Sequence, residues 1–134
     1  MPQNKLDRVH RAGEARQQAP EGISSQPFLL ETLIPASENG LGAMIAMLKP
    51  GTLTHWHSHP HGQILYVLSG IALVQCDGGP VEELHAGDSI RFEPGERHWH
   101  GSGATTSLAY LSVQAAHEGS AVAWFEPVTE GDRQ

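Results

Sequence analysis

From Phe28 onward, hydrophobic and polar residues alternate over short stretches that are separated by turn residues. Successive side chains of a strand point to opposite faces, so this alternation predicts half-buried strands. The predicted strands are 28–34, 41–49, 53–59, 63–69, 71–76, 81–85, 89–93, 98–102, 107–114 and 121–126. Turn signals such as Ser69-Gly70 and Glu93-Pro-Gly95 lie between them. Many short strands at close spacing, without a long amphipathic helix, predict an all-β barrel or jelly roll.

The length of the chain bounds its domain organisation. A chain of 134 residues can bury one sizeable core, so we expect a single domain. Residues 1–26 are polar and lack a strong periodicity, which predicts an N-terminal arm. The barrel is then expected over residues 27–127, and a short C-terminal tail over residues 128–134.

Charge is distributed unevenly along the chain. Four of the eight basic residues lie within the first sixteen positions. Residues 17–134 contain four basic and thirteen acidic side chains, so this part carries a net charge of −9. Because an acidic barrel repels a phosphate backbone, we expect no nucleic-acid partner.

Cysteine content and apolar runs bear on the compartment. Cys76 is the single cysteine, so the chain cannot form an internal disulfide. No run of eighteen apolar residues occurs, and the first residues do not resemble a signal peptide. We therefore expect a cytoplasmic protein without a membrane partner.

Three histidines and a glutamine lie at spacings typical of metal ligands. His57 and His59 are two residues apart, so on a strand they share a face. Gln63 opens the next predicted strand, and His98 lies at the start of a later one. Imidazole nitrogens and an amide oxygen can surround one divalent ion and leave positions open for a substrate. We predict that His57, His59, Gln63 and His98 bind one metal ion.

His100 and Tyr110 are the candidate catalytic residues. His100 shares a face with His98 on the predicted strand. It is therefore either a proton-transferring group beside the metal or a structural histidine of the barrel wall. Tyr110 is either a hydrogen-bond donor in the pocket or a core aromatic. The three tryptophans are expected to pack in the core or at an interface rather than against a substrate.

The spacing of the predicted ligands matches two motifs of the cupin superfamily. The first motif is here Gly51, five residues, His57-Ser-His59, three residues, Gln63, six residues and Gly70. The second motif runs from Gly87-Asp88 through Pro94-Gly95 to His98. The chain therefore resembles a single-domain cupin of the cupin_2 type over roughly residues 40–115. This resemblance implies an RmlC-like jelly-roll β-barrel and a homodimer.

A closer similarity lies in the runs Trp56–Gln63 and His98–Gly101, in Thr105-Thr106 and in the tail Val122–Trp124. These segments resemble the small bacterial manganese-dependent cupin hydroxynitrile lyases. That resemblance implies manganese held by the four predicted ligands, and cleavage or formation of cyanohydrins. Those lyases carry a second active-site histidine on the late strand, where this chain has Tyr110. An unperturbed phenol titrates near pH ~10 and an imidazole near ~6.5, so Tyr110 is a poorer base.

Gln63 stands where most cupins have a glutamate, and it changes the charge of the expected site. A glutamate would leave a divalent site with one positive charge, whereas glutamine leaves two. We expect such an ion to be a stronger Lewis acid, which favours lyase or isomerase chemistry on a small carbonyl or hydroxy compound. Manganese or iron is the expected metal, with nickel and zinc as alternatives. A metal-dependent dioxygenase and a non-enzymatic small-molecule binding protein are the alternative functions.

Overall fold

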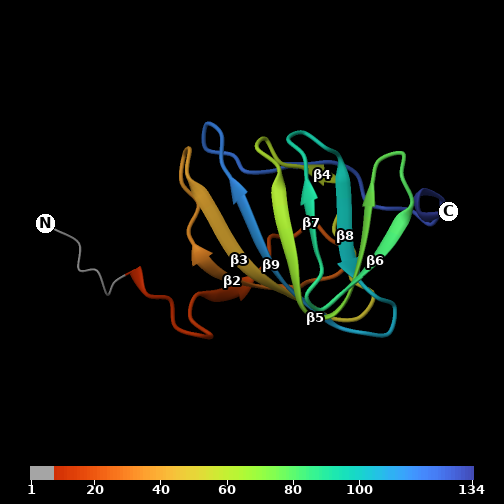
Figure 1. The fold of residues 1–134 in the computed structure, drawn as a ribbon, viewed down its shortest axis with the longest axis horizontal. Coiled ribbons are helices and arrows are strands. Elements are labelled where there is room, and N and C mark those ends of the chain that lie inside the picture. The colour runs from red at the N-terminus through yellow and green to blue at the C-terminus, as the bar shows by residue number, and fades with distance from the viewer. Residues whose placement is uncertain (1–7) are drawn as a thin grey trace, which may run out of the picture.

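The computed structural model describes residues 8–134, and Figure 1 shows a curled, half-barrel sheet of antiparallel strands. The strands are β1 (Arg16–Gln18), β2 (Leu29–Ile34), β3 (Leu41–Leu48), β4 (His57–Ser58), β5 (Gln63–Cys76), β6 (Val81–His85), β7 (Ser89–Phe92), β8 (His98–Ser102), β9 (Leu108–Ala115) and β10 (Ala123–Trp124). A single turn of 3₁₀ helix, η2 (Gly131–Arg133), follows them. The predicted all-β class is confirmed.

The strand order is β1-β2-β3-β9-β5-β8-β4-β10, and β6 and β7 also pair with β5. The C-terminal segment leaves β9, crosses the open end of the sheet and ends beyond β6, on the side away from β2 (Figure 1). Within residues 8–134, no helix is long and apolar enough to span a membrane.

The long strand β5 connects the two halves of the curled sheet. Its first half pairs with β7 and β9, and its second half pairs with β6 and β8. Between the halves the register with β9 shifts, and Gly70 has a φ of +80°. A Cβ at Gly70 would collide with the carbonyl of Ser107, so only glycine fits there. The prediction of two strands, 63–69 and 71–76, is therefore wrong: the Ser69-Gly70 signal marks a bulge and not a turn.

Three further elements differ from the predicted strands. The predicted strand 53–59 is reduced to β4, with isolated bridges at Leu53 and Thr54. The predicted strand 121–126 is reduced to β10. Strand β1, which the sequence did not predict, pairs with β2, and Arg16 and His10 bond to the buried carboxylate of Glu31. The described part of the N-terminal arm is thus joined to the barrel.

Side-chain alternation places a core and a polar pocket on the same inner face. On β5, Leu65 and Val67 are fully buried, whereas Ile64 and Tyr66 on the outer face are exposed. Gln63 precedes them on the inner face, as the period of two predicts. The inner face therefore carries apolar side chains at its centre and polar side chains toward one end.

Candidate metal site

The histidines of the two motifs meet at that polar end of the barrel. Strands β4 and β8 pair through His57 and His98, whose rings lie 4.3 Å apart. The nitrogens of His57, His98 and His100 come within 4.8 Å of one another. His59 is not in that tightest group, but its ring centroid lies 5.2 Å from His57 and 5.4 Å from His98. The structure therefore gathers four histidines, all buried, from two segments far apart in the sequence.

Three of these histidines have one ring nitrogen held by a backbone carbonyl. The Nδ1 atoms of His57, His59 and His98 lie 2.8, 2.7 and 2.9 Å from the carbonyl oxygens of His55, Ala121 and Glu96. A carbonyl oxygen can only accept, so each Nδ1 carries the proton and each Nε2 keeps a lone pair. Such outer hydrogen bonds fix the tautomer and the ring orientation of metal-binding histidines. We call these three the anchored histidines.

Gln63 directs its amide oxygen at the anchored histidines. Its Nε2 donates to the hydroxyl of Ser112 at 2.7 Å, and its Oε1 lies 3.3 Å from Nε2 of His98. With Nδ1 of His98 protonated, both of these facing atoms are hydrogen-bond acceptors. Two lone pairs directed at each other repel unless a cation lies between them.

Two further observations fit a metal ion. Nε2 of His59 is buried without a hydrogen-bond partner, although buried polar atoms are normally paired. Burial lowers the pKa of His57 and His59, and lowers that of His98 to about 3, so their imidazoles are neutral at physiological pH. Neutral imidazoles with free Nε2 lone pairs, and one amide oxygen, form a donor set that suits a divalent transition metal.

His100 differs from the anchored histidines. Both of its ring nitrogens are buried and neither has a hydrogen-bond partner in the structure. Burial holds its pKa well below the usual value. The ring of Tyr110 meets it edge to face at 5.0 Å, and burial raises the pKa of that phenol above its usual range. His100 therefore retains both a donor and an acceptor that no residue of the described range 8–134 uses.

A cavity of about 210 Å³ opens beside these residues. Its lining consists of Pro20, Ile23, Phe28, Leu30, Met44, Thr54, His57, His59, Gln63, His100, Tyr110, Ser112, Gln114, Ala121, Val122 and Trp124. None of these described residues carries a carboxylate, an ammonium or a guanidinium group. A larger hollow of about 470 Å³ lies elsewhere, around Phe28, Met47 and Ser107, and contains no histidine or carboxylate. Of these two hollows, only the smaller, largely apolar cavity is lined by histidines of the two motifs.

The C-terminal segment forms one wall of this cavity. Strand β10 pairs with β4, and the indole of Trp124 lies 4.6 Å from the ring of His57. Ala121 supplies the carbonyl that holds His59. The expectation that every tryptophan packs away from the site is therefore wrong for Trp124. The predicted strand 121–126 did not reveal this position, because the contact with His57 depends on the pairing of β10 with β4.

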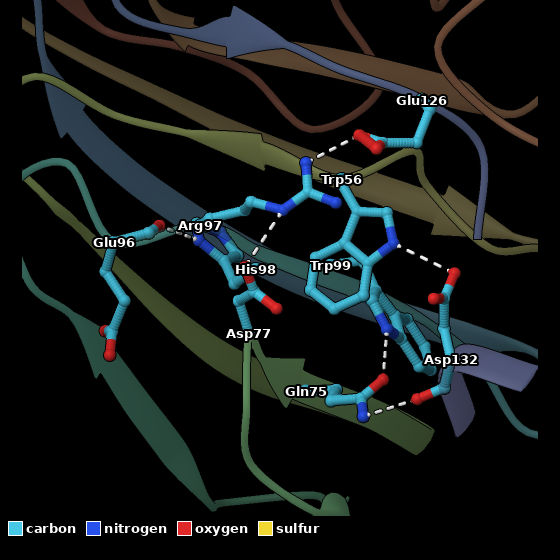
Figure 2. A network of polar contacts seen from close by, with 9 residues as sticks. All are labelled: Trp56, Gln75, Asp77, Glu96, Arg97, His98, Trp99, Glu126 and Asp132. Carbon is cyan, nitrogen blue, oxygen red and sulfur yellow. Dashed lines mark hydrogen bonds and ion pairs between the residues drawn. The ribbon is translucent and has the colours of Figure 1, made fainter. Parts of the chain in front are cut away.

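A polar network holds the C-terminal segment against the barrel (Figure 2). Arg97 lies over the indole of Trp56 at 4.6 Å and donates to the carboxylate of Glu126 at 2.6 Å. The indole nitrogen of Trp56 donates to Asp132 at 3.2 Å. Since His98 follows Arg97 directly, the same strand end carries both the ligand candidate and the group that holds the segment.

Phe92 is a site residue that the sequence analysis did not identify. Its ring stacks on His98 with the centroids 3.5 Å apart and the planes 8° apart. It is fully buried at the end of β7. Stacking against Phe92 prevents the His98 ring from tilting out of its plane. The hydrogen bond to the Glu96 carbonyl prevents the ring from turning within that plane. A signal existed, because Ile90 and Phe92 alternate with polar residues on the predicted strand 89–93, inside the second motif.

Comparison with known proteins identifies the family. The model of the Cupin_2 family, described as a cupin domain, matches residues 44–114. The chain belongs to this family. A cupin-like protein from Thermotoga maritima has the same fold, with a TM-score of 0.82 and 26% identity over 92% of this chain and 95% of that one. The predicted jelly-roll cupin fold is confirmed.

A curated relative of this cupin is the (R)-mandelonitrile lyase of Granulicella tundricola, 49% identical over 82 residues. The match covers 61% of this chain and 63% of the relative, less than two thirds of its length. It confirms the resemblance to hydroxynitrile lyases. The DMSP lyase DddQ of Ruegeria pomeroyi shares the fold, with a TM-score of 0.65 and 24% identity over 77% of this chain and 54% of that one. The predicted homodimer and cytoplasmic location stay predictions.

Proposed function

We propose that this cupin is a metal-dependent lyase that cleaves and forms cyanohydrins of small apolar carbonyl compounds. The observation that carries the proposal is His100, a buried neutral histidine with two unpartnered nitrogens beside a set of metal-ligand candidates. The relative that acts as an (R)-mandelonitrile lyase shares nearly half of the aligned residues, which supports the same reaction class here.

We further propose that His57, His59, Gln63 and His98 hold one divalent ion, manganese or iron first among the alternatives. The tautomers of the anchored histidines and the direction of the Gln63 oxygen support this set. Such an ion supplies a Lewis acid that stabilises negative charge on a substrate oxygen or on cyanide. No ligand in this set is anionic, so the site favours an anionic or strongly polarised substrate.

In this proposal His100 moves the proton. It accepts the hydroxyl proton of the cyanohydrin on its free lone pair, while the carbon–cyanide bond breaks and cyanide leaves with the electron pair. The same proton is then delivered to cyanide, which gives one aldehyde or ketone and one HCN. Burial keeps His100 neutral beforehand, so its lone pair is free, and the same burial makes it a weak base that gives the proton up to cyanide readily. Tyr110 stays protonated and can only donate a hydrogen bond.

The cavity supports a compact, apolar substrate. Phe28, Leu30, Met44 and Val122 contribute apolar side chains, and Trp124 adds an aromatic surface. At about 210 Å³ the space suits a molecule of the size of an aromatic aldehyde and excludes sugars with several rings.

The experiment is to follow release of benzaldehyde and HCN from mandelonitrile with chelator-treated protein reloaded with manganese(II) or iron(II). Turnover that needs the metal and is lost in His100→Ala supports the proposal. If turnover is unchanged by metal removal or by His100→Ala, the proposal is wrong. Oxygen consumption by the iron-loaded protein with phenols or diketones would instead favour the dioxygenase. Tight ligand binding without turnover would favour a binding protein.

A further inference from the structure

Gln63 lies directly across the sheet from a second glutamine. In the register of β5 with β9, Gln63 pairs with Gln114, and Ser112 lies two residues earlier on the same inner face. All three side chains are buried. Their hydrogen bonds can therefore be counted without competition from bulk water.

The hydrogen bond from Gln114 to the backbone determines how the side chains of Gln114, Ser112 and Gln63 are oriented. Nε2 of Gln114 donates to the carbonyl of Gly42 at 3.4 Å, so its Oε1 faces inward. The hydroxyl of Ser112 donates its single proton to that Oε1. After this donation, the oxygen of Ser112 can act only as an acceptor.

The next hydrogen bonds determine Gln63. Its Nε2 donates to Ser112 at 2.7 Å and to Oε1 of Gln114 at 3.3 Å, which uses both amide protons. The reversed amide would place an oxygen against two acceptors. Oε1 of Gln63 therefore points away from Ser112, toward Nε2 of His98.

We propose that Ser112 and Gln114 are positioning residues that hold the Gln63 oxygen on the anchored histidines and select glutamine over glutamate at position 63. The inference rests on the ligand set of the proposed function. Two residues of β9 then control the charge of the site. They favour a neutral ligand at position 63, and a neutral ligand leaves a divalent ion with both of its positive charges.

A glutamate at position 63 would conflict with this network. A carboxylate has no proton to donate, so it would face Oε1 of Gln114, another acceptor. Ser112 could donate to the carboxylate only by withdrawing its proton from that same oxygen of Gln114. Relief requires Gln114 to turn its amide over, and the bond to the Gly42 carbonyl is then lost. The loss of that bond, together with the carboxylate facing an acceptor oxygen, is the source of the preference for glutamine.

The test is the affinity of metal-free protein for manganese(II), measured by competition with a fluorescent chelator. Ser112→Ala is expected to weaken binding by about tenfold or more, as changes to groups that orient metal ligands do. Gln114→Met, of similar size, is expected to act in the same direction. Ser102→Ala is the matched control, because Ser102 is equally buried, bonds to the Lys49 carbonyl and lies outside the cavity. It should change the affinity by less than about twofold.

Repeating the Ser112→Ala measurement in the Gln63→Glu protein separates a loss of Gln63 orientation from a general disturbance of the structure. The two oxygens of a carboxylate are equivalent, so a glutamate needs no group to turn it. Ser112→Ala should therefore weaken binding in the natural protein and have little or no effect in the Gln63→Glu background. Equal losses in both backgrounds, or no loss in either, would overturn the proposal. Far-ultraviolet circular dichroism on each variant checks that the fold is retained.

These readouts are independent of the lyase reaction. If the pattern of affinities holds but mandelonitrile is not cleaved, the proposed reaction fails and the positioning role stands. If Gln63→Ala binds manganese(II) as tightly as the natural protein, Gln63 is not a ligand and the positioning role fails with it.

Discussion

The two sides of the histidine cluster are built differently. On one side, His57, His59 and His98 each have a ring nitrogen bonded to a backbone carbonyl, and Phe92 stacks on His98. On the other side, His100 has no hydrogen-bond partner on either nitrogen. The first arrangement fixes where three lone pairs point before any ligand arrives. The second leaves a buried group whose hydrogen-bonding capacity is available to a substrate.

This difference separates the residues suited to bind a metal ion from the residue suited to transfer a proton. A metal ligand gains from being rigid, because the protein then loses little conformational entropy when it binds the ion. A proton-transferring group must accept and release a bond, so a strong permanent partner would oppose its role. The compact group His57, His98 and His100 fits a ligand set by distance alone, but only two of its members have the hydrogen bond that orients a ligand.

The largest effect is expected for His57→Ala. Loss of a ligand should weaken metal binding by more than about 100-fold, beyond what changes to outer groups cause, and abolish metal-dependent turnover. Elemental analysis of purified protein measures this directly, with about one metal per chain expected before substitution. His55→Ala is the control: it removes a nearby imidazole and keeps the carbonyl that holds His57. Equal metal content in His57→Ala and the natural protein would rule out the ligand set.

His100→Ala should separate the two sides most clearly. We expect turnover to fall by about 100- to 10,000-fold, the usual contribution of a general acid–base, while metal content is retained. His100→Gln, which keeps the site filled, should behave in the same way. If either variant loses its metal, His100 is a ligand and the distinction between the two sides is wrong.

The sequence predicted the parts of this arrangement that depend on strand periodicity. Alternation along β5 placed Gln63 on the face that carries Leu65, and the two-residue spacing of His98 and His100 placed both on the buried inner face of β8. These predictions required only that the segments be strands, because the direction of a side chain then follows from its position.

What the sequence did not reveal depends on contacts between distant segments. The Ser69-Gly70 signal lies beside a bulge and not at a turn, because β9 continues beside it, and the Ser107 carbonyl leaves room only for glycine at position 70. Trp124 reaches His57 because Trp56 and Arg97 hold the segment that follows it. Lone-pair directions are also absent from the sequence, since backbone carbonyls two or sixty-two residues away set them.

The pH dependence of the free energy of unfolding further tests how fully His100 is excluded from water in the folded protein. Each histidine has a pKa near ~6.5 when unfolded, and burial lowers the pKa of all four in the fold. Unfolding therefore takes up protons below pH ~6.5, so metal-free protein should lose stability as pH falls from there toward the lowered values, which for His98 is a pKa of about 3.

Between its folded and unfolded pKa values, each such histidine changes the free energy of unfolding by about 1.4 kcal/mol per pH unit. Denaturant titrations at several pH values can measure this slope. His100→Phe should reduce the total slope by about that amount. Val74→Ala, at the partner position on β5, should lower stability at every pH without changing the slope. An unchanged slope in His100→Phe would mean that His100 is already charged in the folded protein.

The smallest effect is expected for Tyr110→Phe. The ring remains against His100, so only one neutral hydrogen bond to a substrate is removed, worth about 1 kcal/mol or roughly fivefold in kcat/KM. Because burial raises the pKa of Tyr110, the phenol stays protonated and the pH profile should keep its shape. Tyr66→Phe, on the exposed outer face of β5, is the control and should change nothing. A loss as large as that of His100→Ala would instead make Tyr110 a proton donor in its own right, and the reacting side of the cluster would then consist of two residues.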